Sequence, residues 1–188
     1  MSSQYVAQRI LTLAQEQGAL AYGEFTLASG QKSGYYFDGR LLTLSPRGSN
    51  LAAEALLPVI RAAGAAAVGG PAVAAVPLAA AIAMRSGQDG GAEVPAFFVR
   101  KETKDHGLGK RIEGPLPKGA PVAVVDDTCS TAGSLYEAIE AVEAAGHRVV
   151  LAACILDRGQ GGSERLRKDG YPFYAVLLGD AQGRVSPA

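Results

Sequence analysis

Two acids followed by a hydroxyl-rich turn are the residues of this sequence best suited to chemistry. Asp126 and Asp127 directly follow the apolar run 122–125, and small and hydroxyl residues join them to a helical pattern that begins near Ser134. Carboxylates accept hydrogen bonds from sugar hydroxyls, and the free backbone N–H groups at a helix start hold phosphates. The order of residue types therefore predicts a sugar-phosphate site at the carboxyl end of a buried strand.

The turn itself, called the phosphate turn below, consists of Thr128, Cys129, Ser130, Thr131, Ala132, Gly133 and Ser134. It has one glycine and no lysine, which disfavours a nucleoside triphosphatase with a GxxxxGK[ST] loop. The alternative interpretation is that the two acids only end a strand and cap a helix. We expect Cys129 to be a small packing residue, although an exposed thiol in this turn could be oxidised.

A basic loop lies one predicted strand before the acid pair. Residues 100–111 contain five basic side chains, two acids and His106, and their glycines predict mobility. A polar loop of this length suits a lid that closes over a polyanion, although a solvated surface loop has the same composition. In such a lid His106 could donate to a phosphate oxygen or move a proton, whereas the alternative is an ordinary surface histidine.

Two further segments carry residues that suit an anionic ring. Residues 23–40 place the aromatic run Tyr35-Tyr36-Phe37 beside Lys32 and Arg40, which fits a flat heterocycle with negative charge. A β-hairpin whose aromatics cover the edge of the core explains the same residues equally well. Arg158 follows another predicted strand, so we expect it on a loop at the same end of the sheet, with a surface salt bridge as the alternative.

Composition favours a compact enzyme of the cytoplasm. The 188 residues are 48% hydrophobic, which suits one domain over residues 1–188. The 18 basic and 18 acidic side chains balance, so no global field favours nucleic acid or an anionic membrane. Cys129 and Cys154 lack the spacing of a metal site or a disulfide framework, and the amino terminus lacks a secretory signal.

Patterning predicts an α/β fold. The uncharged stretch 62–84 is long enough for a membrane helix, but its prolines and glycines divide it into a strand at 65–68, a turn at Gly69-Gly70 and a buried helix. We expect helices at about 4–17, 46–63, 71–87 and 133–145. We expect strands at about 65–69, 94–100, 121–126, 148–155 and 171–178, a β-type region at 25–42 and a frayed tail at 181–188. This alternation predicts a parallel sheet with helices on both faces.

Taken together, these segments resemble the orotate phosphoribosyltransferase family over residues 23–162. The acid pair and its turn resemble the phosphoribosyl diphosphate (PRPP) signature of the wider type I superfamily, which includes enzymes for adenine, hypoxanthine and uracil. The segments that resemble the orotate enzymes in particular are Phe25-Thr-Leu-x-Ser-Gly-x-Lys-Ser, Arg100-Lys-Glu-x-Lys-Asp-His-Gly and Asp157-Arg158. The resemblance implies the type I phosphoribosyltransferase fold, with a parallel-sheet core flanked by helices at 60–180 and a small hood formed mostly by residues 1–45.

The resemblance also implies the reaction of orotate with PRPP to give orotidine 5′-monophosphate and pyrophosphate, a step of pyrimidine synthesis. Basic residues would compensate the charge of the departing pyrophosphate. Magnesium is the implied cofactor, held by substrate oxygens and water without a direct protein ligand. The implied assembly is a homodimer in which loop 100–111 completes the neighbouring active site, with no nucleic-acid or membrane partner.

The resemblance assigns roles to individual residues of this sequence. Those implied in catalysis are Lys101, Lys104, His106, Asp126 and Asp127. Those implied in PRPP binding are Arg100, Lys101, Lys104, His106, Asp126, Asp127 and the whole phosphate turn. Those implied in orotate binding are Lys32, Tyr36, Phe37, Ser130 and Arg158, of which the arginine would pair with the carboxylate and an aromatic would cover the ring.

The sequence departs from the family pattern at a few positions. Ala132 stands where the family commonly has glycine, Gly34 replaces a frequent proline, and Thr128-Cys129 replace a usual aliphatic pair. We expect these changes to affect substrate affinity more than activity, because none removes a charged group that the chemistry uses. Two alternatives remain: a transferase for another base, and a PRPP-sensing regulator, which the zero net charge disfavours.

Overall fold

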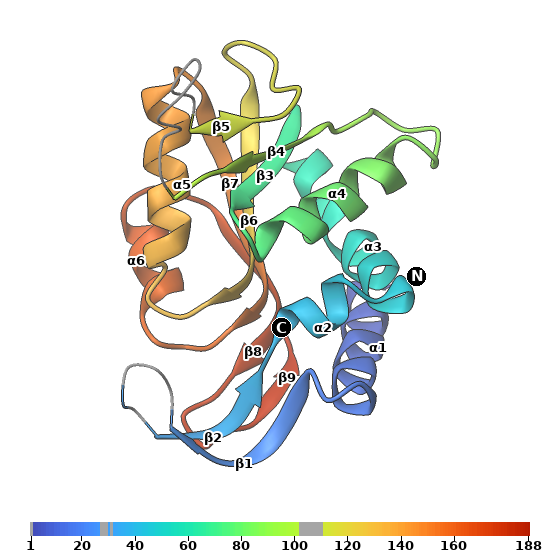
Figure 1. Cartoon of the computed structure of the whole chain (residues 1–188), viewed down its shortest axis with the longest axis vertical. Helices are drawn as coiled ribbons and strands as arrows, with labels where there is room; N and C mark the ends of the chain where they lie inside the picture. Colours follow the sequence, from blue (N-terminus) through green and yellow to red (C-terminus); the bar gives the residue numbers. More distant parts are fainter. Residues whose placement is uncertain (1, 27–29, 31, 102–110) are drawn as a thin grey trace.

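A mostly parallel sheet forms the centre of the protein in the computed structural model, which describes residues 2–26, 30, 32–101 and 111–188 (Figure 1). Within these residues seven strands form one sheet in the order β5-β4-β3-β6-β7-β8-β9, and two more form the separate hairpin β1-β2. The strands are β1 Leu20–Thr26, β2 Lys32–Phe37, β3 Ala67–Pro71, β4 Ala96–Val99, β5 Ile112–Glu113, β6 Pro121–Cys129, β7 Arg148–Asp157, β8 Phe173–Gly179 and β9 Val185–Pro187. The helices are α1 Ser3–Glu16, α2 Gly39–Thr43, α3 Pro46–Ala62, α4 Ala75–Ser86, α5 Gly133–Ala144 and α6 Gly162–Lys168.

The parallel part of the sheet matches the predicted alternation. Strands β4, β3, β6, β7 and β8 pair in parallel, while the edge strands β5 and β9 add antiparallel pairs. The carboxyl ends of neighbouring parallel strands meet at one edge of a sheet, where α/β proteins bind ligands. In this protein that edge carries Pro71 from β3, the acid pair from β6 and Asp157 from β7.

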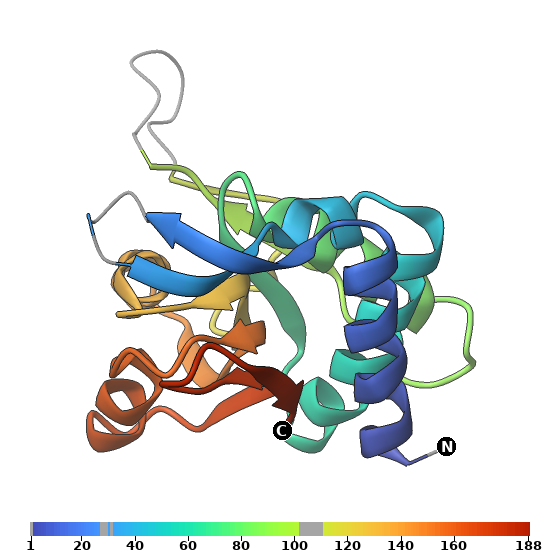
Figure 2. The ribbon, with the colours of Figure 1, turned by 90° about the horizontal axis from the view of Figure 1, so that it is seen from below.

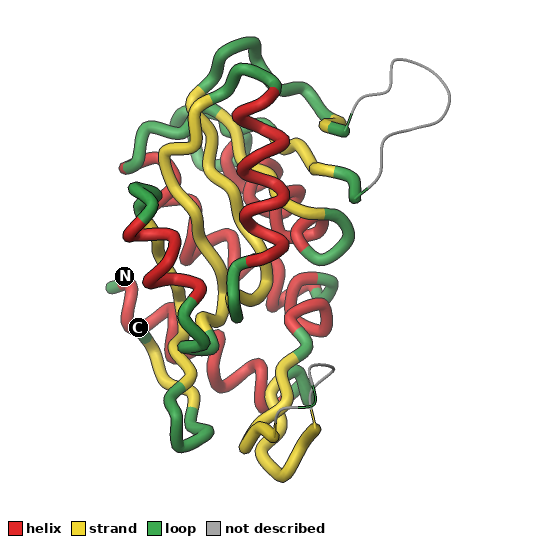
Figure 3. The backbone as a smooth tube through the Cα atoms, turned by 90° about the vertical axis from the view of Figure 1, so that its left-hand side faces the viewer, coloured by secondary structure: helices red, strands yellow, loops and turns green. Residues whose placement is uncertain are grey.

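Helices cover both faces of the sheet, and the strand sequences show why. Alternate residues of a strand point to opposite faces. Along β6, Ala123 and Val125 pack in the core that α1, α3 and α4 share, whereas Val122 and Val124 pack in the core beneath α5 and α6. Figure 3 looks onto this second face, with α5 in front of the strands. A strand buried on both sides needs the continuous apolar run that the sequence has.

The amino-terminal hairpin β1-β2 lies beside the β8-β9 end of the sheet (Figures 1 and 2). The amide of Val185 in β9 donates to the Tyr22 hydroxyl of β1 at 3.4 Å. The predicted β-type region at 25–42 was partly wrong, because its last residues form α2, where Asp38 caps the helix by accepting from the Arg40 amide at 3.1 Å.

Two other predictions of local structure were wrong. The carboxyl-terminal tail is not frayed, because Val185–Pro187 pair with β8 and Val185 is buried. The Gly69-Gly70 pair lies inside β3 and forms no turn. A Cβ on Gly70 would collide with the Val125 carbonyl of β6, so glycine allows the two strands to approach closely. The sequence prediction also missed the two short elements α6 and β5.

The uncharged stretch 62–84 divides among the end of α3, strand β3 and helix α4, as the rejection of a membrane helix required. None of the helices in the described part of the chain has the length and apolar character needed to cross a membrane.

Candidate active site

A cleft of about 700 Å³ opens at the carboxyl ends of β3, β4 and β6. A smaller pocket of about 190 Å³ shares Asp126, Thr128 and Ser134 with it. The cleft is lined by Tyr36, Phe37, Asp38, Arg40, Pro71, Ala72, Val73, Ala74, Phe98, Arg100, Lys101, Asp126, Asp127, Thr128, Ser134 and Glu137. The smaller pocket is lined by Asp126, Thr128, Ser130, Thr131, Ala132, Gly133, Ser134 and Leu135. The acid pair thus lies between a wide cleft and a narrow pocket formed by the phosphate turn.

The two carboxyl groups of the acid pair are held in an environment that disfavours their charge. Desolvation, followed by the nearby Asp127 carboxylate, raises the pKa of Asp126 to about 8. Desolvation also raises the pKa of Asp127, and the charge of Arg40 opposes this shift. The Asp127 amide donates to Asp126 Oδ1 at 2.9 Å, and the Thr128 hydroxyl donates to Asp127 Oδ1 at 3.2 Å. Hydroxyl donors or a cation beside the pair would therefore relieve an unfavourable interaction.

The phosphate turn joins β6 to α5 through a left-handed residue. Strand β6 continues to Cys129, three residues beyond the predicted end at 126, and α5 begins at Gly133. Ala132 has φ 64° and ψ 16°, the left-handed conformation that favours glycine, and its side chain makes no capping bond to the helix. No side chain at this position caps the first N–H groups of α5, and an anion site at a helix start needs such uncapped donors.

The turn that joins β7 to α6 packs against the phosphate turn. The amide of Gly162, the first residue of α6, donates to the Ser130 carbonyl at 3.0 Å. The Cys129 side chain is buried, and this burial raises its pKa to about 12. Cys129 is therefore a packing residue, as expected, and the alternative of an exposed, oxidisable thiol is wrong. In this structure Cys129 can contact a phosphate only through its backbone.

The basic loop enters the cleft at its first two residues. Arg100 and Lys101 follow β4 and line the cleft, and the Arg100 side chain lies 3.7 Å from Glu113 of β5. The Arg100 amide donates to the Arg111 carbonyl at 2.8 Å, which closes the base of the loop. Lys104 and His106 lie outside the described residues, so their predicted roles stay predictions.

The aromatic segment forms a hairpin, as the alternative interpretation required, and it also reaches the cleft; binding of an anionic ring by these residues stays a prediction. Tyr36 and Phe37 line the cleft, and Tyr36 is 43% exposed while Phe37 is buried. Lys32, at the start of β2, is exposed and lines neither pocket.

Arg158 follows β7 and lines neither pocket, and it forms no ion pair with a carboxylate in the described part of the chain. Its guanidinium carbon lies 5.1 Å from the centre of the Tyr35 ring, and its Nη2 donates to Ser33 Oγ at 3.4 Å. The arginine, which follows a strand of the central sheet, therefore contacts the aromatic hairpin.

Asp38, Gly39 and Arg40 form a part of the site that the sequence prediction did not assign. The Arg40 guanidinium donates to both oxygens of Asp38, at 2.8 and 2.9 Å, and its charge partly opposes the rise that desolvation causes in the Asp127 pKa. Gly39 is buried against Asp127, where an added Cβ would lie 2.7 Å from Oδ2. The only signal in the sequence was Asp-Gly-Arg directly after the aromatic strand.

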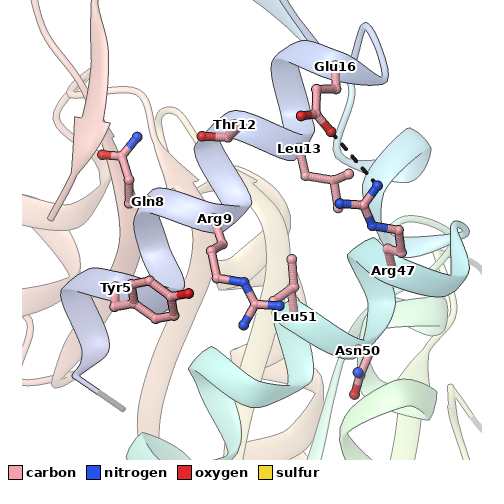
Figure 4. A pocket seen from close by; sticks show the side chains of 9 residues that line it. All are labelled: Tyr5, Gln8, Arg9, Thr12, Leu13, Glu16, Arg47, Asn50 and Leu51. Atoms are coloured by element: carbon pink, nitrogen blue, oxygen red, sulfur yellow. Dashed lines mark ion pairs between the residues drawn. The ribbon is translucent and has the colours of Figure 1, made fainter.

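A groove between α1 and α3 is separate from this site (Figure 4). Its volume is about 250 Å³, and all its lining residues belong to these two helices. The Arg47 guanidinium lies 3.9 Å from the Glu16 carboxylate across the groove, and both side chains are more than half exposed. Such a pair contributes little to stability, and the groove shares no lining residue with the cleft.

Comparison with known proteins first defines the class. A family model described as a phosphoribosyl transferase domain matches residues 53–173, which include the acid pair and the phosphate turn. The chain is also similar in fold to an adenine phosphoribosyltransferase from Leishmania tarentolae, with a TM-score of 0.62 at 18% identity over 91% of this chain and 87% of the other. The protein is thus a phosphoribosyltransferase by fold and by the sequence of its central site.

More similar relatives define the family within that class. The orotate phosphoribosyltransferase of Rhodopirellula baltica is 43% identical over 161 residues, covering 82% of this chain and 83% of the relative. That of Methanopyrus kandleri is 36% identical over 92% of this chain and 90% of its own length. The crystal structure of the Mycobacterium tuberculosis H37Rv enzyme matches with a TM-score of 0.80 and 34% identity, over 94% of this chain and 97% of that chain. This chain belongs to the orotate phosphoribosyltransferase family.

Proposed function

We propose that the protein transfers the phosphoribosyl group of PRPP to orotate, forming orotidine 5′-monophosphate and pyrophosphate in pyrimidine biosynthesis. The observation that carries this proposal is the acid pair at the end of β6, which faces a cleft lined by Arg100 and Lys101 and adjoins the pocket of the phosphate turn. A sugar between two groups of phosphate oxygens needs these three parts in this order. A Mycobacterium tuberculosis relative, 31% identical, has been crystallised in complex with PRPP.

We infer that the phosphate turn holds the 5′-phosphate and the acid pair holds the ribose. The uncapped start of α5 offers N–H groups, and Ser130, Thr131 and Ser134 line the same pocket with their hydroxyls. Ribose hydroxyls would donate to Asp126 and Asp127, whose pKa values are raised mainly by desolvation. Anchoring at both groups would fix the sugar carbon that reacts.

The chemistry breaks the bond between ribose C1 and a pyrophosphate oxygen and forms a bond from C1 to a ring nitrogen of orotate, whose proton passes to the departing pyrophosphate or to water. The transition state has positive charge on the ribose and growing negative charge on the leaving group. The acid pair lies where it would stabilise the positive charge on the ribose. Arg100 and Lys101 line the cleft where they would stabilise the negative charge on the leaving pyrophosphate. We propose that Lys104 and His106 of the basic loop add to this stabilisation, with Lys104 the most important for catalysis.

We propose that orotate lies against β2, with Tyr36 or Phe37 covering the ring. Both aromatics line the cleft. Arg158 would pair with the orotate carboxylate through two parallel N–H donors, and Lys32 would supply a second cation. Ser130, the remaining residue that we propose for base binding, lines the smaller pocket that adjoins the cleft.

Magnesium fits the donor chemistry of this site. Two adjacent carboxylates provide the hard oxygen donors that Mg²⁺ prefers, and their raised pKa values would fall beside a cation. Among the described residues no three His, Cys, Asp or Glu side chains gather into a group that could hold a metal alone. We propose that Mg²⁺ is held mainly by pyrophosphate and ribose oxygens and by water, with the acids orienting those ligands. When bound, it would neutralise charge on the leaving group.

We also propose that the single domain works as a homodimer in the cytoplasm and that loop 100–111 completes the neighbouring site. The large apolar side chains Leu41 and Leu44, in and just after α2, are exposed by 49% and 72%, which supports a covered surface there. A Lys104→Ala chain mixed with an Asp127→Asn chain tests this directly. Mixed dimers should recover activity that neither parent has, and no recovery would count against action across the dimer.

The reaction itself is tested by following loss of the orotate ultraviolet band with PRPP and Mg²⁺, beside parallel reactions with uracil, hypoxanthine and adenine. Orotate alone should be consumed. Consumption of another base would instead support a different transferase, and PRPP binding without consumption of any base would support a regulator.

A further inference from the structure

Arg158 is a cation for which the described residues provide no paired carboxylate. It directly follows β7, and its amide donates to the Cys129 carbonyl at 2.8 Å, which ties its backbone to the end of β6. The side chain makes no ion pair with any carboxylate in the described ranges, and its buried Nε has no hydrogen-bond partner. Such a guanidinium needs an anion for full satisfaction, so its direction decides what it can bind.

Tyr35 of β2 sets that direction. Its side chain is 3% exposed, and the Arg158 guanidinium lies over its ring at 5.1 Å from the ring centre. A cation over an aromatic face is attracted by the electrons of the ring. Burial raises the pKa of Tyr35, so the phenol stays neutral near neutral pH and does not become a counter-charge.

Ser33 joins the same support. Its hydroxyl donates to the Tyr35 carbonyl at 2.6 Å and receives the Tyr35 amide at 3.3 Å, which fixes the position of the oxygen. That oxygen accepts the bond from Arg158 Nη2 at 3.4 Å. The arginine is therefore held on one side by a ring and at one nitrogen by a hydroxyl, both from the hairpin.

Two glycine contacts seat this hairpin on the sheet. The Tyr35 hydroxyl lies against Gly179 at the end of β8, where an added Cβ would collide with it. An added Cβ on Gly34 would lie 3.2 Å from the Cα of Gly183, in the turn between β8 and β9. The Tyr35 side chain is therefore packed between β8 and Arg158.

We propose that Tyr35 is a positioning residue that, together with Ser33, aims the Arg158 guanidinium at the carboxylate of the base. The proposal rests on the proposed function, because it assumes that the base carries a carboxylate. Alternation along β2 then divides the work between neighbours: Tyr36 faces the cleft, and Tyr35 points inward beneath the arginine. Recognition of the base would thus depend on a residue that does not touch it.

Steady-state kinetics of Tyr35→Leu, Tyr35→Phe and Arg158→Ala test the proposal. Tyr35→Leu should raise the KM for orotate by about ten-fold while the KM for PRPP and kcat stay within about two-fold, because a lost cation–π contact misdirects only Arg158. Tyr35→Phe keeps the ring and loses only the interaction of the hydroxyl with Arg158, so its KM for orotate should rise less than that of Tyr35→Leu. In the double variant Tyr35→Leu/Arg158→Ala, the KM for orotate should equal that of Arg158→Ala, because the two residues act through one contact.

Tyr22→Leu is the matched control, because Tyr22 also joins the hairpin to β9 but does not touch Arg158. It should leave the KM for orotate unchanged. Equal rises in both KM values for Tyr35→Leu, or additive effects in the double variant, would overturn the proposal in favour of a purely structural role. If Tyr35→Leu does not fold, Ser33→Ala decides: about a three-fold rise in the KM for orotate supports the proposal, and no rise contradicts it. A wild-type protein that consumes no orotate would reject the proposed function itself, whereas a normal wild type with an indifferent Tyr35→Leu rejects only this inference.

Discussion

Replacing Ala132 by glycine should leave the protein about as stable as the wild type, although the alanine is buried. Its methyl group is 4% exposed, so its loss costs about 0.8 kcal/mol, and the greater freedom of glycine in the unfolded chain costs about 0.4–1 kcal/mol. Against these terms, glycine relieves the left-handed backbone at φ 64°, which costs an alanine about 1–2 kcal/mol. The terms offset each other to within about 1 kcal/mol.

Ala138→Gly is the matched control for this prediction. Ala138 is fully buried in the interior of α5, where glycine loses the same methyl burial and about 1 kcal/mol of helix propensity with no backbone relief. It should therefore be destabilised by about 2 kcal/mol, which lowers Tm by roughly 5 °C in a protein of this size. Thermal unfolding followed by circular dichroism measures both variants. Equal losses of Tm at the two positions would refute the claim that the turn stores backbone strain at Ala132.

Two further predictions concern the acid pair. Gly39→Ala should push Asp127 out of place and lower kcat/KM for PRPP by about 100-fold, whereas Gly87→Ala, where an added Cβ meets only ordinary contacts, should not; equal kinetics would refute the steric argument. The Tm of Asp126→Asn, compared with that of the wild type at the same pH, should increase as pH rises. The folded pKa of about 8 lies above the ordinary value of 3.8, so the stability that the neutral carboxyl contributes is complete below about pH 4 and lost through about pH 8. Melting curves across this range check the sign, and a gain that shrinks with pH would contradict it.

Local patterning was enough to predict the elements whose residues are buried on a regular period. The run 122–125 is apolar throughout because β6 is covered on both faces, and the sequence alone therefore identified the strand that carries the acid pair. The short elements could not be found in this way. Helix α2 and strand β9 have five and three residues, and they form because Asp38 caps one and β8 pairs with the other. Their sequences carry too few periods to signal a structure.

The same distinction applies to the site. The acid pair and the phosphate turn are contiguous in sequence, so their types and order predicted their proximity. The contact between Ser33 and Arg158 joins residues 125 positions apart, and the approach of Gly39 to Asp127 likewise depends on how the hairpin seats on the sheet. No local pattern encodes either contact, because both depend on which surfaces meet when the core packs.

The central claim is that this site joins orotate to the ribose of PRPP, and the stoichiometry of the reaction tests it most directly. Purified protein would be mixed with orotate, PRPP and Mg²⁺, and orotate, orotidine 5′-monophosphate and pyrophosphate would be quantified over time by chromatography. The account predicts one nucleotide and one pyrophosphate for each orotate consumed, with no pyrophosphate release when orotate is left out. Pyrophosphate release that does not depend on orotate, or orotate that stays unchanged beside PRPP, would contradict it.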